Sequence, residues 1–150
     1  LFHSMDVKAE DWQSVFDGLE QYAGRLLQAH EIQFKTKIEI RKDPGTKPDS
    51  LLALIVFNVC REGLNNVVKH SKATTVDLFV SLDEDWLIMT LSDNGIGIGS
   101  VTGSGRGMTI MRKRAEEVGG RVSVAGEKRG TTITLELPVR LEPVTEEKRS

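Results

Sequence analysis

Several features are scarce or absent in this sequence, and each absence narrows the possibilities. Cys60 is the only cysteine among 150 residues, so no disulfide framework can form and a reducing compartment is expected. Cys60 lies within an apolar helical pattern, which indicates a small buried side chain. The formal net charge of -2 gives no indication of a nucleic-acid partner. We find no signal peptide and no apolar run long enough to cross a bilayer, and therefore expect no membrane contact by this domain.

The remaining composition is that of an ordinary globular domain. Apolar residues make up 39% of the chain and charged residues 28%, and the length suffices for one core without metal or disulfide support. We assign residues 1–140 to this domain and expect residues 141–150, a charged tail, to be frayed. The chain opens on Leu1 rather than Met, so we expect it to be part of a longer protein.

The spacing of apolar residues predicts three helices and five strands. Helical spacing is found over the ranges Lys8 to His30, Pro48 to Ser71, and Met108 to Val118. Alternation predicts strands over Ile32–Ile40, Thr75–Leu82, Trp86–Ser92, Arg121–Ala125 and Thr131–Val139. A glycine- and serine-rich loop is expected from Gly95 to Gly107, and Gly119-Gly120 is expected to end the third helix.

The order of these elements indicates the fold class. Helix, strand, helix, two strands, loop, helix and two strands suggest an α/β two-layer sandwich. Its mixed, largely antiparallel sheet would carry the helices on one face. The glycine-rich loop would then lie between the sheet and the second and third helices.

The most informative stretch is Asp93-Asn94-Gly95-Ile96-Gly97, which directly follows an apolar strand. Glycines on either side of Ile96 permit positive φ angles and leave no side chains in the way. A flat ligand could therefore lie against the backbone while the Asp93 carboxylate accepts a hydrogen bond from it. The alternative is an ordinary turn, because Asp and Gly close many hairpins.

A polar face on the second helix is the next candidate. Glu62, Asn66 and His70 are each four residues apart and share one face, with Lys69 beside them. Mg²⁺ takes few protein ligands alongside phosphate oxygens, so a lone Asn amide oxygen could suffice. A nearby Glu could polarise an attacking group. The pattern suits a nucleoside triphosphate site, and a merely solvated face is the alternative.

Two further stretches fit such a site. Gly103-Ser104-Gly105-Arg106-Gly107-Met108 precedes a helix, and its backbone amides could bind an anion. It is neither a P-loop nor a dinucleotide fingerprint, and a flexible loop is the alternative. Thr131, after Gly130, could place a hydroxyl near Asp93 if their strands lie side by side. Otherwise it is an ordinary β-branched residue at the start of a strand.

Taken together, these motifs resemble a known superfamily. Glu62-x-x-x-Asn66 with Lys69-His70, then DNGIG, GSGRGM and Gly130-Thr131, resemble the N, G1 and G2 boxes and terminal GT of the GHKL ATPases. Within that superfamily, REGLNNVVKHSKA, GRGMTIMRKRAEEVGG and GTTITLELP are most similar to the catalytic ATP-binding domain of bacterial sensor histidine kinases. The resemblance spans roughly Ala9 to Pro138 and implies a Bergerat-type fold.

The resemblance also implies a role for each residue. Asp93 would bind the adenine amino group of ATP, assisted through water by Thr131, and Asn66 would hold Mg²⁺ while Lys69 reaches phosphate. Glu62 would act as general base or would orient the acceptor or the metal, and His70 has either a site role or a helix-terminal structural one. The remaining cofactor-binding residues would be Gly95, Gly97, Ile98, Gly105, Arg106, Gly107 and Met108.

The chain departs from a complete kinase in one respect. Neither His3 nor His30 lies in a phosphoacceptor box, so the phosphorylated histidine is expected on a separate pair of dimerisation helices. The implied partners are those helices and a response regulator. The domain alone is expected to be monomeric and cytoplasmic. Alternatives are an anti-sigma-factor serine kinase of the same superfamily, a non-enzymatic nucleotide-sensing module, and a self-contained ATPase of the gyrase type.

Overall fold

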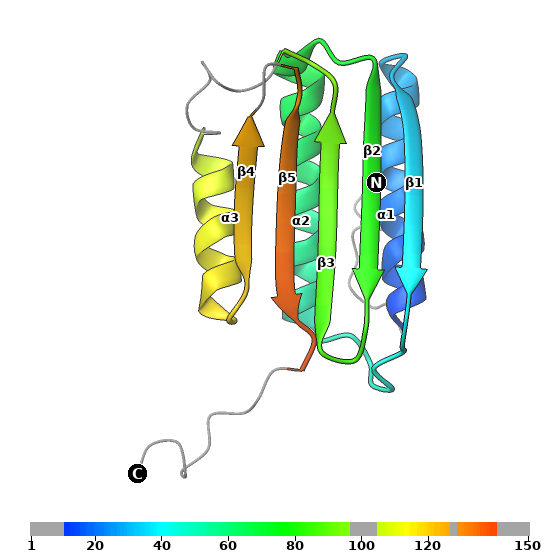
Figure 1. Ribbon diagram of the computed structural model, residues 1–150, viewed down its shortest axis with the longest axis vertical. Helices are drawn as coiled ribbons and strands as arrows, with labels where there is room; N and C mark the ends of the chain where they lie inside the picture. The colour runs from blue at the N-terminus through cyan, green and yellow to red at the C-terminus, as the bar shows by residue number, and fades with distance from the viewer. Residues whose placement is uncertain (1–10, 97–104, 127–128, 141–150) are drawn as a thin grey trace.

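The computed structural model describes residues 11–96, 105–126 and 129–140. The described helices are α1 (Trp12–Ala29), α2 (Ser50–Asn66), the π-helix η2 (Val67–Ser71) and α3 (Gly105–Glu117). The strands are β1 (Gln33–Ile40), β2 (Thr75–Leu82), β3 (Trp86–Asp93), β4 (Arg121–Gly126) and β5 (Thr131–Pro138). Figure 1 shows the five strands side by side with the helices behind them.

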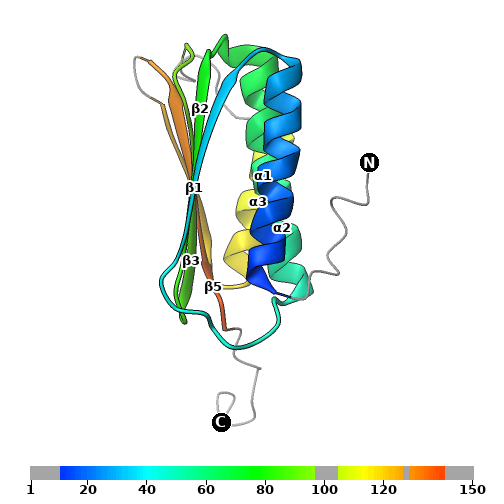
Figure 2. The same cartoon turned by 90° about the vertical axis from the view of Figure 1, so that its right-hand side faces the viewer.

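The sheet has the order β1-β2-β3-β5-β4. Its β1–β2 pair is parallel and its other three pairs are antiparallel. All three α-helices cover the same face of the sheet, as the side view in Figure 2 shows. The predicted two-layer sandwich with a mixed, mostly antiparallel sheet is therefore confirmed. Alternate residues of each central strand point into the space between the layers, which is where the hydrophobic core lies.

Helix α1 begins where Asp11 caps it. The Asp11 carboxylate accepts a hydrogen bond from the Ser14 amide at 2.8 Å and so satisfies one of the free N–H groups of the first turn. The helix was expected from Lys8, but the extended backbone of Asp11, with φ -146°, makes it begin at Trp12. Residues 8–10 themselves lie outside the described part of the chain. Its buried stripe recurs at helical spacing and includes Phe16, Leu19 and Leu27, all fully buried.

Helix α2 is the central helix and begins in the same way. Asp49 accepts hydrogen bonds from the amides of Leu51 and Leu52. The helix lies very close to the sheet: a Cβ at Gly63 would be 2.7 Å from Cδ2 of Leu91 and 3.0 Å from Cδ1 of Ile133. Glycine at 63 therefore lets the polar end of α2 approach the ends of β3 and β5.

The apolar character of α2 corrects one expectation from the sequence. Ser50–His70 is long and apolar enough to cross a membrane by length and composition, with a mean hydropathy of 1.4. In the structure, 56% of the 18-residue window that has this hydropathy is buried inside the fold. Most apolar residues of α2 belong to the domain's core, which accounts for the composition, whereas Leu51 and Leu54 are exposed.

The second helix does not continue to Ser71 as a regular α-helix. After Asn66 it becomes a π-helix, which ends at Lys72 in the left-handed conformation with φ 56°. A π-turn has more residues per turn than an α-helix, so residues after Asn66 are rotated from the register of residues before it. The predicted common face accordingly holds for Glu62 and Asn66, which are half-buried, whereas His70 is exposed.

Helix α3 begins three residues earlier than expected, at Gly105 rather than at Met108. Two glycines in its first turn disfavour a helix, but tertiary packing outweighs that propensity, because Met108 is fully buried in the core. The predicted end is confirmed. Gly119 has a φ of 85°, and the Gly120 amide donates to the Ala115 carbonyl at 2.8 Å.

Candidate functional site

The predicted site residues that the structure describes gather at one end of the sheet. Strand β3 ends there and β5 begins there, while η2 and the first turn of α3 lie at the same end (Figure 1). The turn after β3 is tied to both neighbouring strands. The Asn94 amide donates to the Thr75 carbonyl at 3.3 Å, and the Gly130 amide donates to the Gly95 carbonyl at 2.7 Å.

Asp93 ends β3 on the face that points toward the helices, in sequence with the buried Leu87, Met89 and Leu91. Its carboxylate is half-buried and accepts a hydrogen bond from the Gly95 amide at 2.8 Å. Partial burial raises the pKa of the Asp93 carboxyl, and hydrogen bonds from the amides of Gly95 and Thr131 oppose that shift. Such a partly dehydrated carboxylate is a strong acceptor for a ligand's N–H group.

Thr131 lies directly opposite Asp93 in the β3–β5 pair. The strands are therefore side by side, which was the condition for placing the Thr131 hydroxyl near Asp93. Thr131 is 7% exposed, and its Oγ1 has no hydrogen-bond partner in the described part of the chain. A buried hydroxyl left without a partner costs about 1 to 3 kcal/mol. The unpartnered oxygen suggests that a ligand or a water molecule completes the site.

Glu62 contacts the first turn of α3. A Cβ built on Gly107 would overlap the carboxyl group of Glu62, so that group lies directly against the glycine backbone. Two motifs that are far apart in sequence, on α2 and α3, are thereby brought together. Glu62 forms no hydrogen bond or ion pair with a described residue.

Asn66 and the basic residues continue this face toward the end of the helix. Asn66 is half-buried, and its side chain makes no capping hydrogen bond. Lys69 and His70 are both exposed in η2, and neither forms an ion pair within the described residues. The face thus offers an amide oxygen and a free cation.

Asn94 has a role that sequence reasoning missed. Its Oδ1 accepts hydrogen bonds from the amides of Thr74 and Thr75, both at 2.9 Å, and its Nδ2 donates to Thr74 Oγ1 at 2.8 Å. These bonds fasten the turn after β3 to the start of β2. An Asn in a turn usually bonds locally, so only the pairing of β2 with β3 could have indicated this longer connection.

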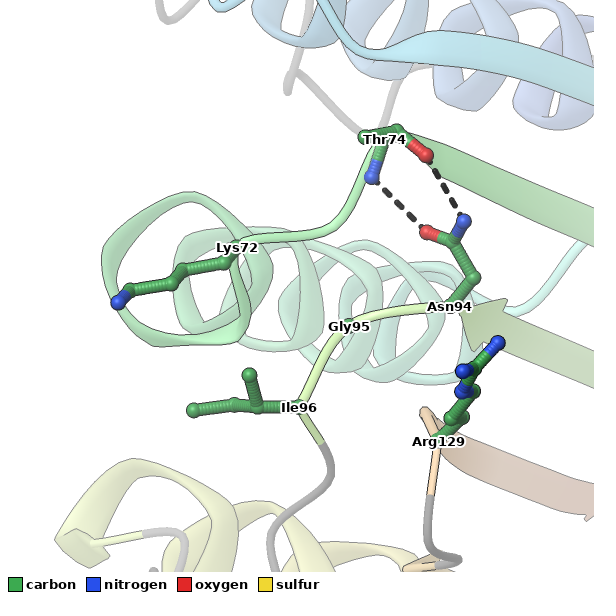
Figure 3. A pocket seen from close by; sticks show the side chains of 6 residues that line it. All are labelled: Lys72, Thr74, Asn94, Gly95, Ile96 and Arg129. Carbon is green, nitrogen blue, oxygen red and sulfur yellow. Dashed lines mark hydrogen bonds between the residues drawn. The ribbon is translucent and has the colours of Figure 1, made fainter.

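A cavity of about 480 Å³ opens beside this turn (Figure 3). Its lining residues come from three separate loops: Lys72, Thr74, Asn94, Gly95, Ile96 and Arg129. Lys72 and Arg129 are exposed cations that form no ion pair with the described residues, and neither was predicted as a site residue. Of the predicted residues only Gly95 lines this cavity, and Asp93 is not among its lining residues.

The remaining predicted residues are only partly described. Gly97 and Ile98 lie outside the described residues. Gly105 and Arg106 form the first two positions of α3, and their backbone alone is described. Met108 is fully buried and belongs to the hydrophobic core.

Comparison with known proteins places this arrangement in a family. The sequence profile of a family described as "Histidine kinase-, DNA gyrase B-, and HSP90-like ATPase" matches residues 52–141. That region contains every predicted site residue, from Glu62 to Thr131. The chain belongs to this family.

Curated relatives of this ATPase domain are sensor histidine kinases. It is 31% identical over 128 residues to the sensor histidine kinase NarS of Mycobacterium tuberculosis, a match that covers 81% of this chain and 29% of NarS. It is 34% identical over 95 residues to the oxygen sensor histidine kinase NreB of Staphylococcus carnosus, covering 61% of this chain and 27% of NreB. The chain therefore spans less than a third of the length of these two relatives.

Solved structures share the fold of this ATPase domain. The histidine kinase domain of the blue-light activated kinase of Erythrobacter litoralis EL346 superposes with a TM-score of 0.62 at 17% identity, covering 83% of this chain and 61% of that chain. Histidine kinase AdeS of Acinetobacter baumannii gives a TM-score of 0.60 at 12% identity, covering 87% and 66% respectively. At these identities the likeness concerns the fold alone.

Proposed function

We propose that this domain binds Mg-ATP and presents the γ-phosphate to a histidine on a separate dimerisation domain of the same parent protein. The phosphate then passes to an aspartate of a response regulator, in two-component signal transduction. The observation that carries the proposal is the half-buried Asp93 carboxylate opposite the unpartnered Thr131 hydroxyl, in a chain of this ATPase family. The sensor kinases among its relatives favour a histidine acceptor.

The Asp93 end of the site suits adenine. The exocyclic amino group of adenine is a hydrogen-bond donor, and the Asp93 carboxylate accepts it. The Thr131 hydroxyl bonds a ring nitrogen through a water molecule, which satisfies the buried oxygen. Gly95 and Gly97 add no side chain that would keep the flat ring from the backbone.

The residues of the other end suit a metal-bound triphosphate. No group of three or more His, Cys, Asp or Glu side chains that could hold a metal occurs in the described residues. The oxygen donor offered here is the Asn66 side-chain amide, and such a donor fits Mg²⁺, which prefers oxygen ligands and takes the rest from phosphates and water. Asn66 Oδ1 would hold it, and when bound Mg²⁺ offsets phosphate charge. Phosphate oxygens are bound by Lys69 and by the first backbone N–H groups of α3, which Gly105 and Gly107 leave uncovered because glycine has no side chain.

The chemistry asked of the protein is positioning and charge neutralisation. Ile98 and Arg106 contact the nucleotide in this proposal, whereas Met108 supports the start of α3 from within the core. His70 lies in η2, at the end of the second helix. The acceptor histidine is supplied by the parent protein's dimerisation helices, and we place the domain on the cytoplasmic side, where ATP is available. The isolated domain is a monomer in this proposal.

Nucleotide binding is tested by calorimetry with ATP and MgCl₂. Asp93→Asn should weaken ATP binding by roughly 10- to 100-fold. The amide has a single acceptor oxygen, and the Gly95 N–H already bonds to one oxygen of the Asp93 side chain, so the NH₂ group would face the adenine amino group. Asp77→Asn is the matched control, since Asp77 is exposed on the other face of the sheet, paired with Ser92. Equal ATP affinity of Asp93→Asn and the wild type would overturn the adenine assignment.

Phosphotransfer is tested separately. The chain is mixed with the dimerisation helices of its parent and ATP labelled at the γ-phosphate, and the labelled protein is treated with acid. Phosphohistidine is lost in acid whereas phosphoserine survives, so an acid-stable product would indicate a serine kinase. ATP binding without any transfer would indicate a nucleotide-sensing module.

A further inference from the structure

Glu62 and Gly107 form a close contact between α2 and α3. The Glu62 carboxyl group occupies the volume that a side chain at position 107 would need, since an added Cβ would overlap all three of its terminal atoms. Glycine at 107 therefore does more than loosen the helix start. It creates the space in which a carboxylate lies against the first turn of α3.

This carboxylate has no charge partner in the described structure. The ion pairs found there join residues of β1 and of the loops at the opposite end of the sheet, and none includes Glu62. Glu62 is half-buried, so water screens its charge only partly. The first turn of α3 carries free N–H groups and the positive end of the helix dipole, which tolerate a nearby negative charge.

The position of Glu62 matters if phosphates also bind at this turn, so the inference rests on the proposed function. A carboxylate next to a polyphosphate repels it, and a divalent cation between the two removes most of that repulsion. We propose that Glu62 is a specificity-determining residue. Its carboxylate, held against the start of α3 by the contact with Gly107, makes the site reject ATP that arrives without a divalent cation.

This role differs from that of a general base. A base would have to reach the attacking group, whereas the contact with Gly107 already places the carboxylate beside the phosphate end of the site. Asn66, one turn further along the same face, supplies the metal ligand. Glu62 then adds a penalty that only the metal-bound nucleotide escapes. Nucleotide binding and metal binding become coupled through a residue of this chain.

The experiment measures ATP affinity by calorimetry twice for each protein, once with MgCl₂ and once with EDTA. The quantity compared is the affinity with MgCl₂ divided by the affinity with EDTA, because a structural disturbance would alter both affinities together and leave this ratio unchanged. In Glu62→Gln the ratio should fall by about tenfold relative to the wild type, through tighter binding of metal-free ATP. Glu116→Gln, an equal charge change at an exposed position of α3, should leave the ratio unchanged.

A second variant tests the contact itself. Gly107→Ala should displace the Glu62 carboxylate and lower the ratio as well, while Gly107→Ala combined with Glu62→Ala should give no further change beyond Glu62→Ala alone. An unchanged ratio in Glu62→Gln would overturn the inference and leave the proposed function intact. Failure of the wild-type chain to bind ATP even with MgCl₂ would overturn both.

Discussion

Gly130 lies against the backbone carbonyl of Asp93, and only a glycine fits there. A Cβ at Gly130 would overlap the Asp93 oxygen and lie 3.1 Å from its carbonyl carbon. Gly130 also has a φ of 95°, in the region that other residues rarely adopt. The glycine that precedes Thr131 and the backbone at the end of β3 therefore pack directly against each other.

Replacing this glycine should cost far more than a positive φ angle alone. Gly130→Ala should lower the free energy of unfolding by about 3 kcal/mol or more, because strain and overlap add. Gly45→Ala is the matched control: Gly45 has a φ of 80° but nothing within 4 Å of an added Cβ, so about 1 kcal/mol is expected. Urea unfolding of both variants measures the difference, and equal costs would contradict the contact.

The Asn94 side chain should matter for the stability of the sheet end. Asn94→Ala removes three hydrogen bonds to Thr74 and Thr75, and we expect a loss of about 1 to 2 kcal/mol in the free energy of unfolding. Amide hydrogen exchange should be faster at Thr74 and Thr75 in the variant. Asn58→Ala, which removes one exposed bond from Arg61, should change stability by less than about 0.5 kcal/mol. Unchanged exchange at Thr74 would contradict this role.

Ionised Asp93 should oppose folding at neutral pH. Burial raises the pKa of its carboxyl above the model-peptide value of 3.8, so the folded state binds the proton more tightly than the unfolded state does. Protonation of Asp93 therefore stabilises the folded state fully below the unfolded-state pKa of 3.8, and this stabilisation is lost as the pH rises through the folded-state pKa. Asp93→Asn should be as stable as the wild type or slightly more so at pH 7, and this advantage should shrink toward pH 3. Denaturation curves at both pH values, without nucleotide, measure it; a large loss of stability at pH 7 would contradict the prediction.

Cys60 should be inert in the folded protein. It is fully buried, and burial raises the pKa of its thiol to about 12, so the thiolate needed for reaction is almost absent at pH 8. A thiol reagent such as Ellman's reagent should react with one equivalent only after the protein is unfolded in urea. Rapid modification of the native protein would show that α2 opens readily.

Local patterns were enough to predict most of the fold. The buried stripe of α1 and the alternation of β2 and β3 depend on spacings of a few residues, which the chain displays directly. The start of α1 differs because of a local cap at Asp11, whereas other boundaries differ where distant segments meet. Helix α3 starts at Gly105 because Met108 and Gly107 pack against other elements, and α2 ends in a π-turn that no local periodicity announces.

The candidate site divides in the same way. Asp93 with its following glycines, Asn66 and Gly107 could be selected from the sequence because each residue type has a specific chemical use within a short motif. Asn94, Lys72 and Arg129 could not, because their importance arises from neighbours far along the chain. Gly130 was part of a recognised pair, but the reason for its lack of a side chain is visible only beside Asp93.

By itself, the amino-acid sequence determined the helices and strands, the two-layer architecture and the set of polar residues from which a nucleotide site could be built. Backbone preferences, capping and apolar periodicity act over short distances, so a single chain carries that information openly. Tertiary structure alone decided which of those residues meet. It put Thr131 opposite Asp93, Gly130 against the Asp93 carbonyl and Glu62 over Gly107, because strand order and close helix packing bring together groups that the chain keeps far apart.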